Sequence, residues 1–501
     1  MATKKTQMEP PTTTAPARTA AGFEYAPAPE STSIVNIASS HGLFINGEFC
    51  AGTGTSISTI NPATEEVLSE VAVATSGDVQ KAVAAARRAF PRWSGLKGAE
   101  RGKYLFRIAR IIQERAREIA VLESLDNGKP IKESRDVDIP TAAAHFFYYA
   151  GWADKLAYAG LGTDPRPIGV AGQIIPWNFP FLMLAWKIAP ALATGNTVVL
   201  KPAETTPLTA LLFAEICQQA DLPAGVVNII TGAGETGAEL VAHPDINKIA
   251  FTGSTDVGRS IARQVAGTDK SITLELGGKA ANIVFDDAPI DQAVEGIING
   301  IFFNQGHVCC AGSRLLVQES IAEEVGERLR HRMQSLRVGD PLDKNTDIGA
   351  INSAEQLERI TALVTSGVAE GAHRWAPDCS LPDRGYWFPP TVFTEVSQSH
   401  RIAREEIFGP VLSVLTFRTP REAVEKANNT PYGLSAGIWT EKGSRSLWLA
   451  NQLRAGVVWA NTFNRFDPAS PFGGYKESGF GREGGRHGLA AYLAPATTGG
   501  N

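Results

Sequence analysis

Two adjacent cysteines are the residues of this sequence whose chemistry is easiest to recognise. Cys309 and Cys310 lie among small residues in the segment FFNQGHVCCAGSR, and His307 precedes the first thiol by two positions. A cysteine acts as a nucleophile when a helix N-terminus, a cation or a nearby base lowers its pKa. Residues two apart rarely face each other on a helix, which argues against a Cys–His hydrolase. From this segment alone, buried packing and a nucleophilic role both stay open.

Glu275 interrupts the apolar end of a predicted strand in the segment TLELGGK. A carboxylate is costly at such a place unless it is hydrogen-bonded or functional. A raised pKa would suit a general base that works near neutral pH. The alternative interpretation is a carboxylate paired with the nearby Lys279.

Two glycine-rich turns compete as phosphate sites. Residues 232–237 read GAGETG and fit the GxGxxG pattern after a predicted strand and at a helix start. Residues 253–260 read GSTDVGRS in the same setting, and Arg259 stands where a P-loop needs lysine, which argues against a P-loop nucleotidase. Either helix N-terminus offers N–H groups to a phosphate. The spacing indicates dinucleotide or phosphate binding without choosing the turn.

Lys201 and Glu204 follow the buried run TVVL, at the C-terminal end of a predicted strand. A lysine and a carboxylate there would suit a ribose diol, which needs both donors and acceptors. The acidic group would also repel a 2′-phosphate, so the pair favours NAD over NADP. A solvated loop with ordinary charges is the alternative.

The elements that must position these residues form an α/β pattern between residues 168 and 277. Strands are predicted at 168–175, 197–201, 226–231, 248–252 and 271–276. Helical stretches separate them, so the pattern predicts a doubly wound parallel sheet with its ligand site at the C-terminal strand ends.

The rest of the chain adds three further regions. Residues 78–143 have apolar spacings of three and four and predict helices, and Asn127-Gly128 ends the second of them. A second α/β pattern of similar size extends from about 282 to 472. Folded sequence is expected to begin near residues 42–49, GLFINGEF, as an edge strand. Residues 1–41 start with a stretch rich in Thr, Pro and Ala, and they predict a disordered extension.

Composition limits the class of protein. The chain has 501 residues, a net charge of −5 and 43% hydrophobic residues, without a block of like charges, which argues against nucleic acid or an anionic membrane as a partner. Apolar stretches fall far short of the roughly 20 residues that span a bilayer. The number of cysteines is odd, and their spacing includes no CxxC motif. We therefore expect a protein of a reducing compartment, the cytoplasm, without a metal site. The cysteines are Cys50, Cys217, Cys309, Cys310 and Cys379.

Taken together, these segments resemble the aldehyde dehydrogenase superfamily over about residues 42–492. The motifs follow the family's order: IIPWNFP at 174–180, the Lys201/Glu204 segment, FTGS at 251–254, LELGG at 274–278, FFNQG at 302–306 with Cys309, EEIFGP at 405–410 and PFGGYK at 471–476. The resemblance implies a Rossmann-like cofactor domain and a second α/β catalytic domain. The expected division is an NAD-binding domain at 42–140 and 168–277, a catalytic domain at 278–478, and reduced oligomerisation or bridging segments at 141–167 and 479–501.

The resemblance also implies the roles of the cofactor residues. In this family the pyrophosphate lies by the helix opening at Ser254, which leaves residues 232–237 as a structural turn. Lys201 and Glu204 match the adenosine-ribose clamp, Glu406 matches the nicotinamide-ribose ligand, and Phe408 matches a residue that packs near the ring. The implied cofactor site consists of Ile174, Trp177, Lys201, Glu204, Gly253, Ser254, Glu406 and Phe408.

For the reaction, the resemblance implies that Cys309 is the nucleophile and Cys310 a neighbour without a catalytic role. Asn178 and the Cys309 backbone N–H match the donors to the oxyanion, and Glu275 matches the base that activates water to hydrolyse a thioester. Family members that pass the acyl group to coenzyme A typically lack this glutamate, so its presence favours an NAD-dependent oxidation of aldehyde to acid. A non-catalytic scaffold would be expected to lose Cys309, Asn178 or Glu275.

Two further expectations concern the substrate and the assembly. The positions that match the family's aldehyde tunnel imply an apolar or aromatic aldehyde, and they are Phe179, Met183, Trp186, Phe463 and Phe466. His307 stands where the family usually has glutamine. Only LAYAGLGTDPRPI connects residues 155 and 169, which is shorter than the usual oligomerisation arm, and the C-terminus lacks the β-branched strand that pairs with a partner subunit. We therefore expect a homodimer in place of the common tetramer.

Overall fold

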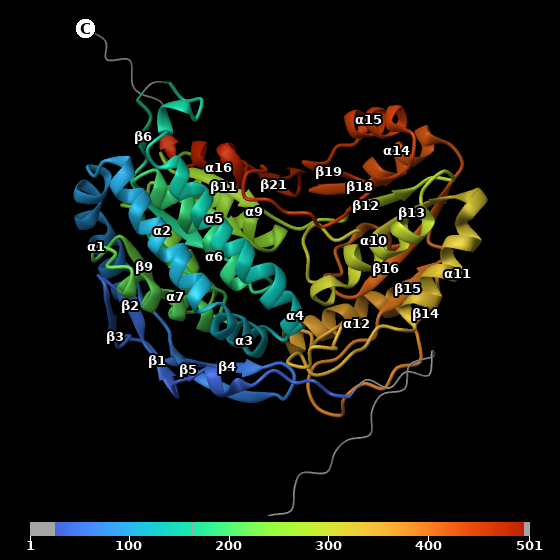
Figure 1. Cartoon of the computed structure of the whole chain (residues 1–501), viewed down its shortest axis with the longest axis horizontal. Coiled ribbons are helices and arrows are strands. Elements are labelled where there is room, and N and C mark those ends of the chain that lie inside the picture. The colour runs from blue at the N-terminus through green and yellow to red at the C-terminus, as the bar shows by residue number, and fades with distance from the viewer. Residues whose placement is uncertain (1–25, 163, 495–501) are drawn as a thin grey trace, which may run out of the picture.

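The computed structural model describes residues 26–162 and 164–494. Figure 1 shows two α/β units side by side, one built on an eight-stranded sheet and one on a seven-stranded sheet. The blue and green elements on the left form the first unit, and the yellow and orange elements on the right form the second. This confirms the predicted mixed α/β fold with parallel sheets.

The first sheet has the strand order β21-β11-β10-β7-β8-β9-β2-β3. Its five central strands are parallel: β7 (Val170–Ile174), β8 (Thr197–Lys201), β9 (Val227–Ile229), β10 (Lys248–Thr252) and β11 (Ser271–Glu275). The connecting helices are α6 (Pro180–Ala193), α7 (Leu208–Gln219), α8 (Gly234–Ala242) and α9 (Thr255–Val265). The sequence predicts all five strands, and the structure differs only at some of their ends.

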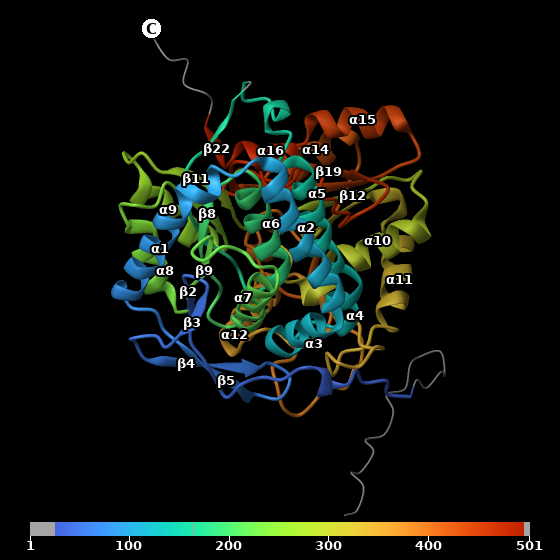
Figure 2. The same ribbon diagram turned by 60° about the vertical axis from the view of Figure 1, so that its left-hand side comes forward.

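Alternating side chains of these strands enter two different cores. Val198 and Leu200 pack into the core that contains α6 and α7. Val199 packs into the core that contains α8, α9 and α1 (Ser76–Ser94), three helices that Figure 2 shows together on one side of the sheet. Because helices cover both faces, the strands carry continuous apolar runs and their C-terminal ends remain at one edge.

The edges of the first sheet are antiparallel. The predicted single strand at residues 42–49 is wrong in detail, because it is a hairpin of β2 (Leu43–Ile45) and β3 (Glu48–Cys50). Its turn lies at Asn46 and Gly47, whose φ angles of 57° and 85° suit a two-residue hairpin turn. At the other edge, β21 (Gly479–Phe480) pairs with β11 and places Gly479 opposite Glu275.

A helical layer covers the outer face of α6. It consists of α2 (Gly98–Glu114), α3 (Ala116–Asn127), α4 (Ile131–Glu133), a π-helical turn η2 (Ser134–Asp138) and α5 (Ile139–Trp152). The predicted end of α3 is confirmed, since Gly128 caps it with a φ of 92° in the left-handed region. Residues 141–152, assigned from the sequence to a bridging segment, lie instead in α5, which packs against α2 and α6. Ala142, Ala143, Phe146, Tyr149 and Ala150 are buried there and belong to the core that contains α6.

The second sheet has the strand order β14-β15-β16-β13-β12-β18-β19 and is parallel except at β14. Its strands are β12 (Ala281–Val284), β13 (Arg314–Gln318), β14 (His373–Trp375), β15 (Thr391–Thr394), β16 (Val411–Phe417), β18 (Ser435–Trp439) and β19 (Val457–Ala460). Its helices are α10 (Ile290–Phe302), α11 (Ala322–Met333), α12 (Ala354–Ala369), α14 (Pro420–Asn428) and α15 (Gly443–Gln452). The second predicted α/β pattern is therefore present.

Small elements complete the described chain. They are η1 (Thr32–Ile34), β1 (Ser40–His41), β4 (Ser56–Asn61), β5 (Glu66–Ala72), η3 (Leu156–Tyr158), β6 (Arg166–Pro167), η4 (Phe303–Gly306), η5 (Glu319–Ile321), α13 (Arg401–Arg404), β17 (Tyr432–Gly433), β20 (Tyr475–Lys476), α16 (Gly485–Ala490) and β22 (Leu493–Ala494). β1, β5 and β4 form a small sheet, β17 pairs with β20, and β6 pairs with β22.

The predicted disordered extension differs from the structure over residues 26–41, while residues 1–25 lie outside the described part. Glu30 forms ion pairs with Arg117 of α3 and Lys344, and its backbone N–H donates to Leu342 O over 2.8 Å. β1 continues the small sheet by pairing with β5. Charged partners and backbone pairing hold this apolar-poor stretch on the surface, and composition alone did not reveal them.

Candidate active site

Cys309 lies in the loop between η4 and β13, against the turn that follows β11. A Cβ on Gly278 would lie 2.2 Å from the Cys309 carbonyl oxygen, so only glycine lets the two segments approach this closely. Cys309 is partly buried and Cys310 is buried. A hydrogen bond with Cys310, together with burial, raises the pKa of the Cys309 thiol well above its usual range. In this state the proposed nucleophile is a neutral thiol that needs a base.

Glu275 supplies a carboxyl group at the C-terminal end of β11. It is 4% exposed, and neither carboxyl oxygen has a hydrogen-bond partner among the described residues. Burial and the neighbouring Glu483 raise its pKa well above the usual range, and the charge of Cys309 acts in the same direction. The alternative ion pair with Lys279 is absent, since the Lys279 ammonium also lacks a hydrogen-bond partner in the described chain.

Lys187 and Glu483 form a buried ion pair close enough to Glu275 to affect its charge. Lys187 Nζ on α6 lies 2.5 Å from Glu483 Oε1. Lys187 lowers the pKa of Glu275, and Glu483 raises it. A titratable carboxyl group without hydrogen-bond partners beside an ion pair is typical of a group whose proton affinity serves a reaction.

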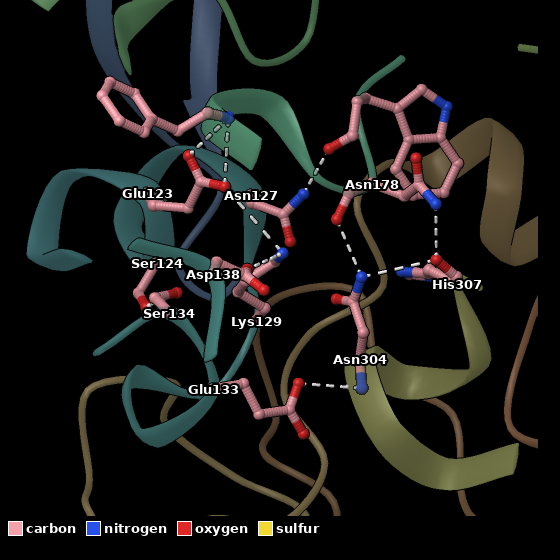
Figure 3. Close-up of polar contacts among 12 residues, drawn as sticks. Glu123, Ser124, Asn127, Lys129, Glu133, Ser134, Asp138, Asn178, Asn304 and His307 are labelled. Carbon is pink, nitrogen blue, oxygen red and sulfur yellow. Dashed lines mark hydrogen bonds and ion pairs between the residues drawn. The ribbon is translucent and has the colours of Figure 1, made fainter. Parts of the chain in front are cut away.

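Asn178 lies in the loop between β7 and α6, where its side-chain amide faces the loop that carries Cys309. Its Nδ2 donates to the His307 carbonyl oxygen over 2.8 Å, and Asn304 Nδ2 donates to the Asn178 carbonyl oxygen over 2.8 Å (Figure 3). An amide nitrogen has two hydrogens, so the second N–H of Asn178 remains available to another acceptor. The structure thus brings Asn178 to the segment of the cysteine.

The adenosine side of the predicted cofactor site lies at adjacent strand ends. Lys201 ends β8 beside Ile174 of β7, and its ammonium lies 3.5 Å from the exposed Glu204 carboxylate. Ser254 caps the N-terminus of α9, and it is exposed, as are Asp256 and Val257 in the first turn. A ribose diol and an anionic phosphate fit this set of a carboxylate, an ammonium and an open helix N-terminus.

The other glycine-rich turn packs against the same strand ends. Gly232 has a φ of 149°, and a Cβ there would lie 2.2 Å from Thr236 Oγ1, which in turn donates to Ala74 O. A Cβ on Gly237 would contact Ile174 and Lys201 at 3.6 and 3.5 Å. These glycines allow close packing of the turn itself, which supports the structural interpretation of residues 232–237.

The nicotinamide side of the predicted site gathers Glu406, Phe408 and Trp177. Glu406 Oε1 accepts from Gly278 N over 2.8 Å, and burial raises the pKa of this carboxyl group to about 7. Trp177 meets Phe408 edge-to-face at 5.2 Å and His307 at 4.8 Å. His307 is buried and stacks on Phe408, and burial lowers its pKa to about 3, so its ring is neutral.

The five predicted tunnel residues do not form one aromatic group. Trp186 and Phe466 meet at 6.3 Å, and Phe472 lies within 6.0 Å of both. Phe463 meets Trp459 at 4.8 Å, and Trp459 meets Phe466 at 5.8 Å, so Phe463 joins this group through Trp459. Phe179 stacks on Phe303 elsewhere, and Met183 N donates to Phe179 O in the first turn of α6.

Sequence reasoning missed several residues of this region. Phe472 and Trp459 extend the Trp186–Phe466 group, Lys187 and Glu483 lie beside Glu275, and Asn304 contacts Asn178. Phe472 and Asn304 lie inside quoted motifs, so their position was an available signal. Lys187 was the lone charge in the apolar run FLMLAWKIAPALA, which is the same kind of signal that identified Glu275.

The described residues show neither a metal-binding cluster nor a membrane-spanning helix. They contain no cluster of three or more His, Cys, Asp or Glu that could hold a metal ion. Within residues 26–162 and 164–494, no helix combines the length and apolar character that a membrane crossing requires.

Comparison with known families and proteins gives one consistent result. Residues 49–498 match the model of the aldehyde dehydrogenase family. An aldehyde dehydrogenase of Alternaria alternata is 47% identical over 468 residues, which cover 91% of this chain and 94% of that protein. A mitochondrial aldehyde dehydrogenase of Rattus norvegicus is 46% identical over 469 residues, 91% of this chain and 90% of that protein.

Solved structures agree with these relatives. An NAD⁺ complex of an aldehyde dehydrogenase from Bacillus cereus is 44% identical, with a TM-score of 0.88, and covers 91% of this chain and 95% of that one. An indole-3-acetaldehyde dehydrogenase in complex with NAD⁺ is 40% identical, with a TM-score of 0.89, over 91% of this chain and 96% of that one.

Proposed function

The chain belongs to the aldehyde dehydrogenase family and is an NAD-dependent enzyme that oxidises aldehydes, and from this premise we propose how its residues carry the reaction. Cys309 forms a covalent adduct with the aldehyde, Asn178 stabilises the oxyanion, and Glu275 serves as the base. The observation that carries the proposal is the buried carboxyl group of Glu275, which has no hydrogen-bond partner in the described chain and interacts electrostatically with Cys309.

The first step is addition of the thiol to the aldehyde. Cys309 Sγ bonds to the carbonyl carbon, the C=O π electrons move to oxygen, and the thiol proton leaves to a base. Glu275 suits that role because its raised pKa gives it affinity for a proton, and its oxygens have no competing donor in the described structure. The second N–H of Asn178 and the Cys309 backbone N–H then donate to the oxyanion, a contribution of roughly a hundred- to a thousandfold each.

The second half of the reaction removes a hydride and then the acyl group. When bound, NAD⁺ accepts the hydride that leaves the thiohemiacetal carbon. Cys309 then carries a thioester. Glu275, having released the thiol proton to solvent, takes a proton from water as the water oxygen bonds to the acyl carbon. The C–S bond breaks, the carboxylic acid leaves, and the thiol regains its proton. Aldehyde, water and NAD⁺ become acid, NADH and a proton.

The cofactor residues fit NAD as a group. Lys201 and Glu204 offer an ammonium and an exposed carboxylate 3.5 Å apart for a ribose diol. The open first turn at Gly253 and Ser254 would hold the pyrophosphate. Glu406 would hold the second ribose, and Trp177 and Phe408 would enclose the ring. The Glu204 carboxylate disfavours an added 2′-phosphate, which supports NAD over NADP.

We assign an apolar or aromatic aldehyde to the enzyme. The support is the group of Trp186, Phe466, Phe472 and Trp459, whose rings lie within 5.5 to 6.3 Å of a neighbour in the group. Aromatic side chains bind apolar substrates through large contact areas and defined ring geometry. Phe179 and Met183 would line the passage nearer to Asn178.

The test of the covalent step compares two adjacent thiols. Cys309→Ser should abolish aldehyde oxidation while NAD still binds, and Cys310→Ser should stay active. Activity is followed by the absorbance of NADH, and NAD binding by quenching of tryptophan fluorescence. Equal loss in both variants, or full activity of Cys309→Ser, would reject the assignment of the nucleophile.

We also propose a homodimer in the cytoplasm. The two short strands β6 and β22 pair with each other, through Leu493 opposite Pro167 and Ala494 opposite Arg166, in the region proposed for assembly. All five cysteines are free thiols, which is typical of a reducing compartment. Light scattering should give the mass of two chains, and a tetramer mass would reject the reduced assembly.

A further inference from the structure

A buried cluster of charged residues lies behind the loop that holds Asn178. Lys129 Nζ lies 2.6 Å from Asp138 Oδ2 and 3.9 Å from Glu123 Oε1, and all three side chains are 0% exposed. Glu133 is buried beside them, where Lys129 lowers and Asp138 raises the pKa of its carboxyl group. We call these four residues the Lys129 cluster, and Figure 3 shows them together.

Burial, the largest cause, raises the pKa of Glu123 to about 7 and that of Glu133 to about 8. One lysine faces three carboxyl groups, so the cluster is expensive to bury. The mechanism proposed above uses none of its members.

One contact of the cluster leads to Asn304, next to the active site. Glu133 Oε2 accepts a hydrogen bond from the backbone N–H of Asn304 over 2.8 Å. Asn304 has a φ of 49°, and Gln305 follows with a φ of 53°, so two consecutive residues adopt the left-handed conformation five positions before Cys309. Such a backbone costs free energy for any residue except glycine and persists only where the surroundings hold it.

The side chain of Asn304 holds the two carbonyl groups that fix Asn178. Its Nδ2 donates to Asn178 O over 2.8 Å and also contacts His307 O at 3.4 Å. The same His307 oxygen accepts from Asn178 Nδ2 over 2.8 Å. Asn304 therefore anchors the Asn178 backbone and the acceptor of the Asn178 side chain with one amide group (Figure 3).

From this geometry we propose that Asn304 is a positioning residue for the Asn178 amide, and that Glu133 holds Asn304 in the conformation this requires. The inference rests on the proposed function, in which Asn178 donates to the oxyanion. A donor stabilises a developing charge most when its direction is fixed before the reaction. With one N–H held by His307 O, the other N–H of Asn178 has a single direction, which Asn304 sets.

A second contact fixes the neighbour of Asn178 to the same cluster. Lys129 Nζ lies 4.2 Å from the centroid of the Phe179 ring, a cation–π geometry, and Asn127 Nδ2 donates to Trp177 O. Trp177, Asn178 and Phe179 are thus each tied to residues of the helical layer or of η4. These three residues are the last ones of the loop between β7 and α6.

The decisive experiment is a double-mutant cycle between Asn178 and Asn304. Asn304→Gly keeps the left-handed backbone and removes the side-chain donor, so it separates the hydrogen bond from strain. We expect Asn304→Gly to lower the rate of the NADH burst by roughly tenfold to a hundredfold, below the loss expected for removing the donor itself. The dissociation constant of NAD and the melting temperature should stay close to those of the unmodified enzyme.

The cycle is completed by Asn178→Ala and by the double variant. If Asn304 acts through Asn178, the double variant is no slower than Asn178→Ala alone, because the second change has nothing left to position. Additive losses, or an unchanged burst rate in Asn304→Gly, would overturn the proposal. Full activity of Asn178→Ala would instead refute the oxyanion role, which keeps the two failures distinct.

Three further variants test this interpretation. Asn46→Gly makes the same change in the left-handed turn between β2 and β3 and should leave the burst rate unchanged. Glu133→Gln keeps an oxygen that can accept from Asn304 N, whereas Glu133→Ala removes it. We expect Glu133→Ala to slow the burst as Asn304→Gly does, with rescue in Glu133→Gln, and equal rates in the two Glu133 variants would contradict the link.

Discussion

Two buried lysines, Lys129 and Lys187, form ion pairs near the proposed active site. The two regions differ in whether a neighbouring carboxyl group is left without a partner. In the Lys129 cluster, Asp138 pairs with the lysine, Glu123 accepts from Phe181 N, and Glu133 accepts from Asn304 N. Beside Glu275, the pair of Lys187 and Glu483 leaves a third carboxyl group without a hydrogen-bond partner in the described chain.

This difference indicates different roles for the two regions. We expect the Lys129 cluster to support the structure and the Glu275 region to take part in the reaction. A buried charge that has a partner stabilises the arrangement of both groups. Removing one of them leaves the other as an uncompensated buried charge. An unpaired buried carboxyl group costs stability, and its raised pKa is useful only in a reaction. Loss of the cation from the Lys129 cluster should therefore act mainly on stability, while Glu133 also acts on the burst rate through Asn304. Substitutions in the Glu275 region should act on turnover.

The largest expected effect is on turnover at Glu275. Glu275→Gln should lower steady-state oxidation by about a hundred- to ten-thousandfold, the range for a general base. The NADH burst should be slowed as well, because the Cys309 thiol loses the base that accepts its proton, and acid should be released slowly. Thermal unfolding should show no loss of stability, because the substitution removes a buried charge. A large fall in melting temperature would contradict the division into a reactive and a supporting region.

The largest expected effect on stability is at Lys129. Lys129→Met should lower the free energy of unfolding by about 3–5 kcal/mol, because it leaves buried carboxyl groups without their cation. Urea denaturation measures this loss. Lys103→Met is the matched control, since Lys103 pairs with Glu100 on the exposed surface of α2, and its loss should stay below about 1 kcal/mol. Similar losses in the two variants would show that the Lys129 cluster does not support the fold.

A smaller effect is expected from the ion pair beside Glu275, whose two members should shift the pH dependence of deacylation in opposite directions. Lys187 lowers the pKa of Glu275, so Lys187→Met should raise it and move the acid limb of deacylation to higher pH. Glu483 raises that pKa, so Glu483→Gln should move the limb to lower pH. Release of acid from a preformed acyl-enzyme, followed against pH, measures both. Shifts in the same direction would break the proposed electrostatic role of the pair.

The smallest effect is a pH dependence within the Lys129 cluster. Burial raises the pKa of Glu123 from 4.5 to about 7, so the folded protein binds more protons than the unfolded chain between these values. The contribution of Glu123 to the free energy of unfolding is therefore largest below about pH 4.5, and it is lost as the pH rises through 7. Glu123→Gln should remove this fall, a change of about 2–3 kcal/mol between pH 5 and 8. Equal pH profiles of the two proteins in urea would contradict the raised pKa.

The sequence predicts the first sheet well because the signal is local. The strands at 197–201 and 248–252 match the structure to the residue, since both are buried apolar runs followed by residues that leave the sheet. Gly128 marks the end of α3 for an equally local reason. Glu275 stands out because one charge interrupts an apolar strand end. Each of these features involves a few consecutive residues and a known spacing.

The residues that hold the proposed active site in place could not be predicted, because their contacts join positions far apart in the sequence. Glu133 and Asn304 are 171 positions apart, and Ala28 and Asp343 are 315 positions apart. Hydrogen bonds of this kind leave no periodicity in either segment. The same reason explains why residues 26–41 resembled a disordered extension.

The pairing of β21 with β11 can form only late in the synthesis of the chain. Glu275 ends a strand whose outer edge is covered by Gly479 and Phe480, which leave the ribosome some 200 residues later. Until then, a nascent chain that has already made its first parallel sheet presents the β11 edge unpaired, and unpaired edges invite association with other chains. The strand that carries the carboxyl group proposed as the base thus keeps an unpaired edge until β21 has been synthesised.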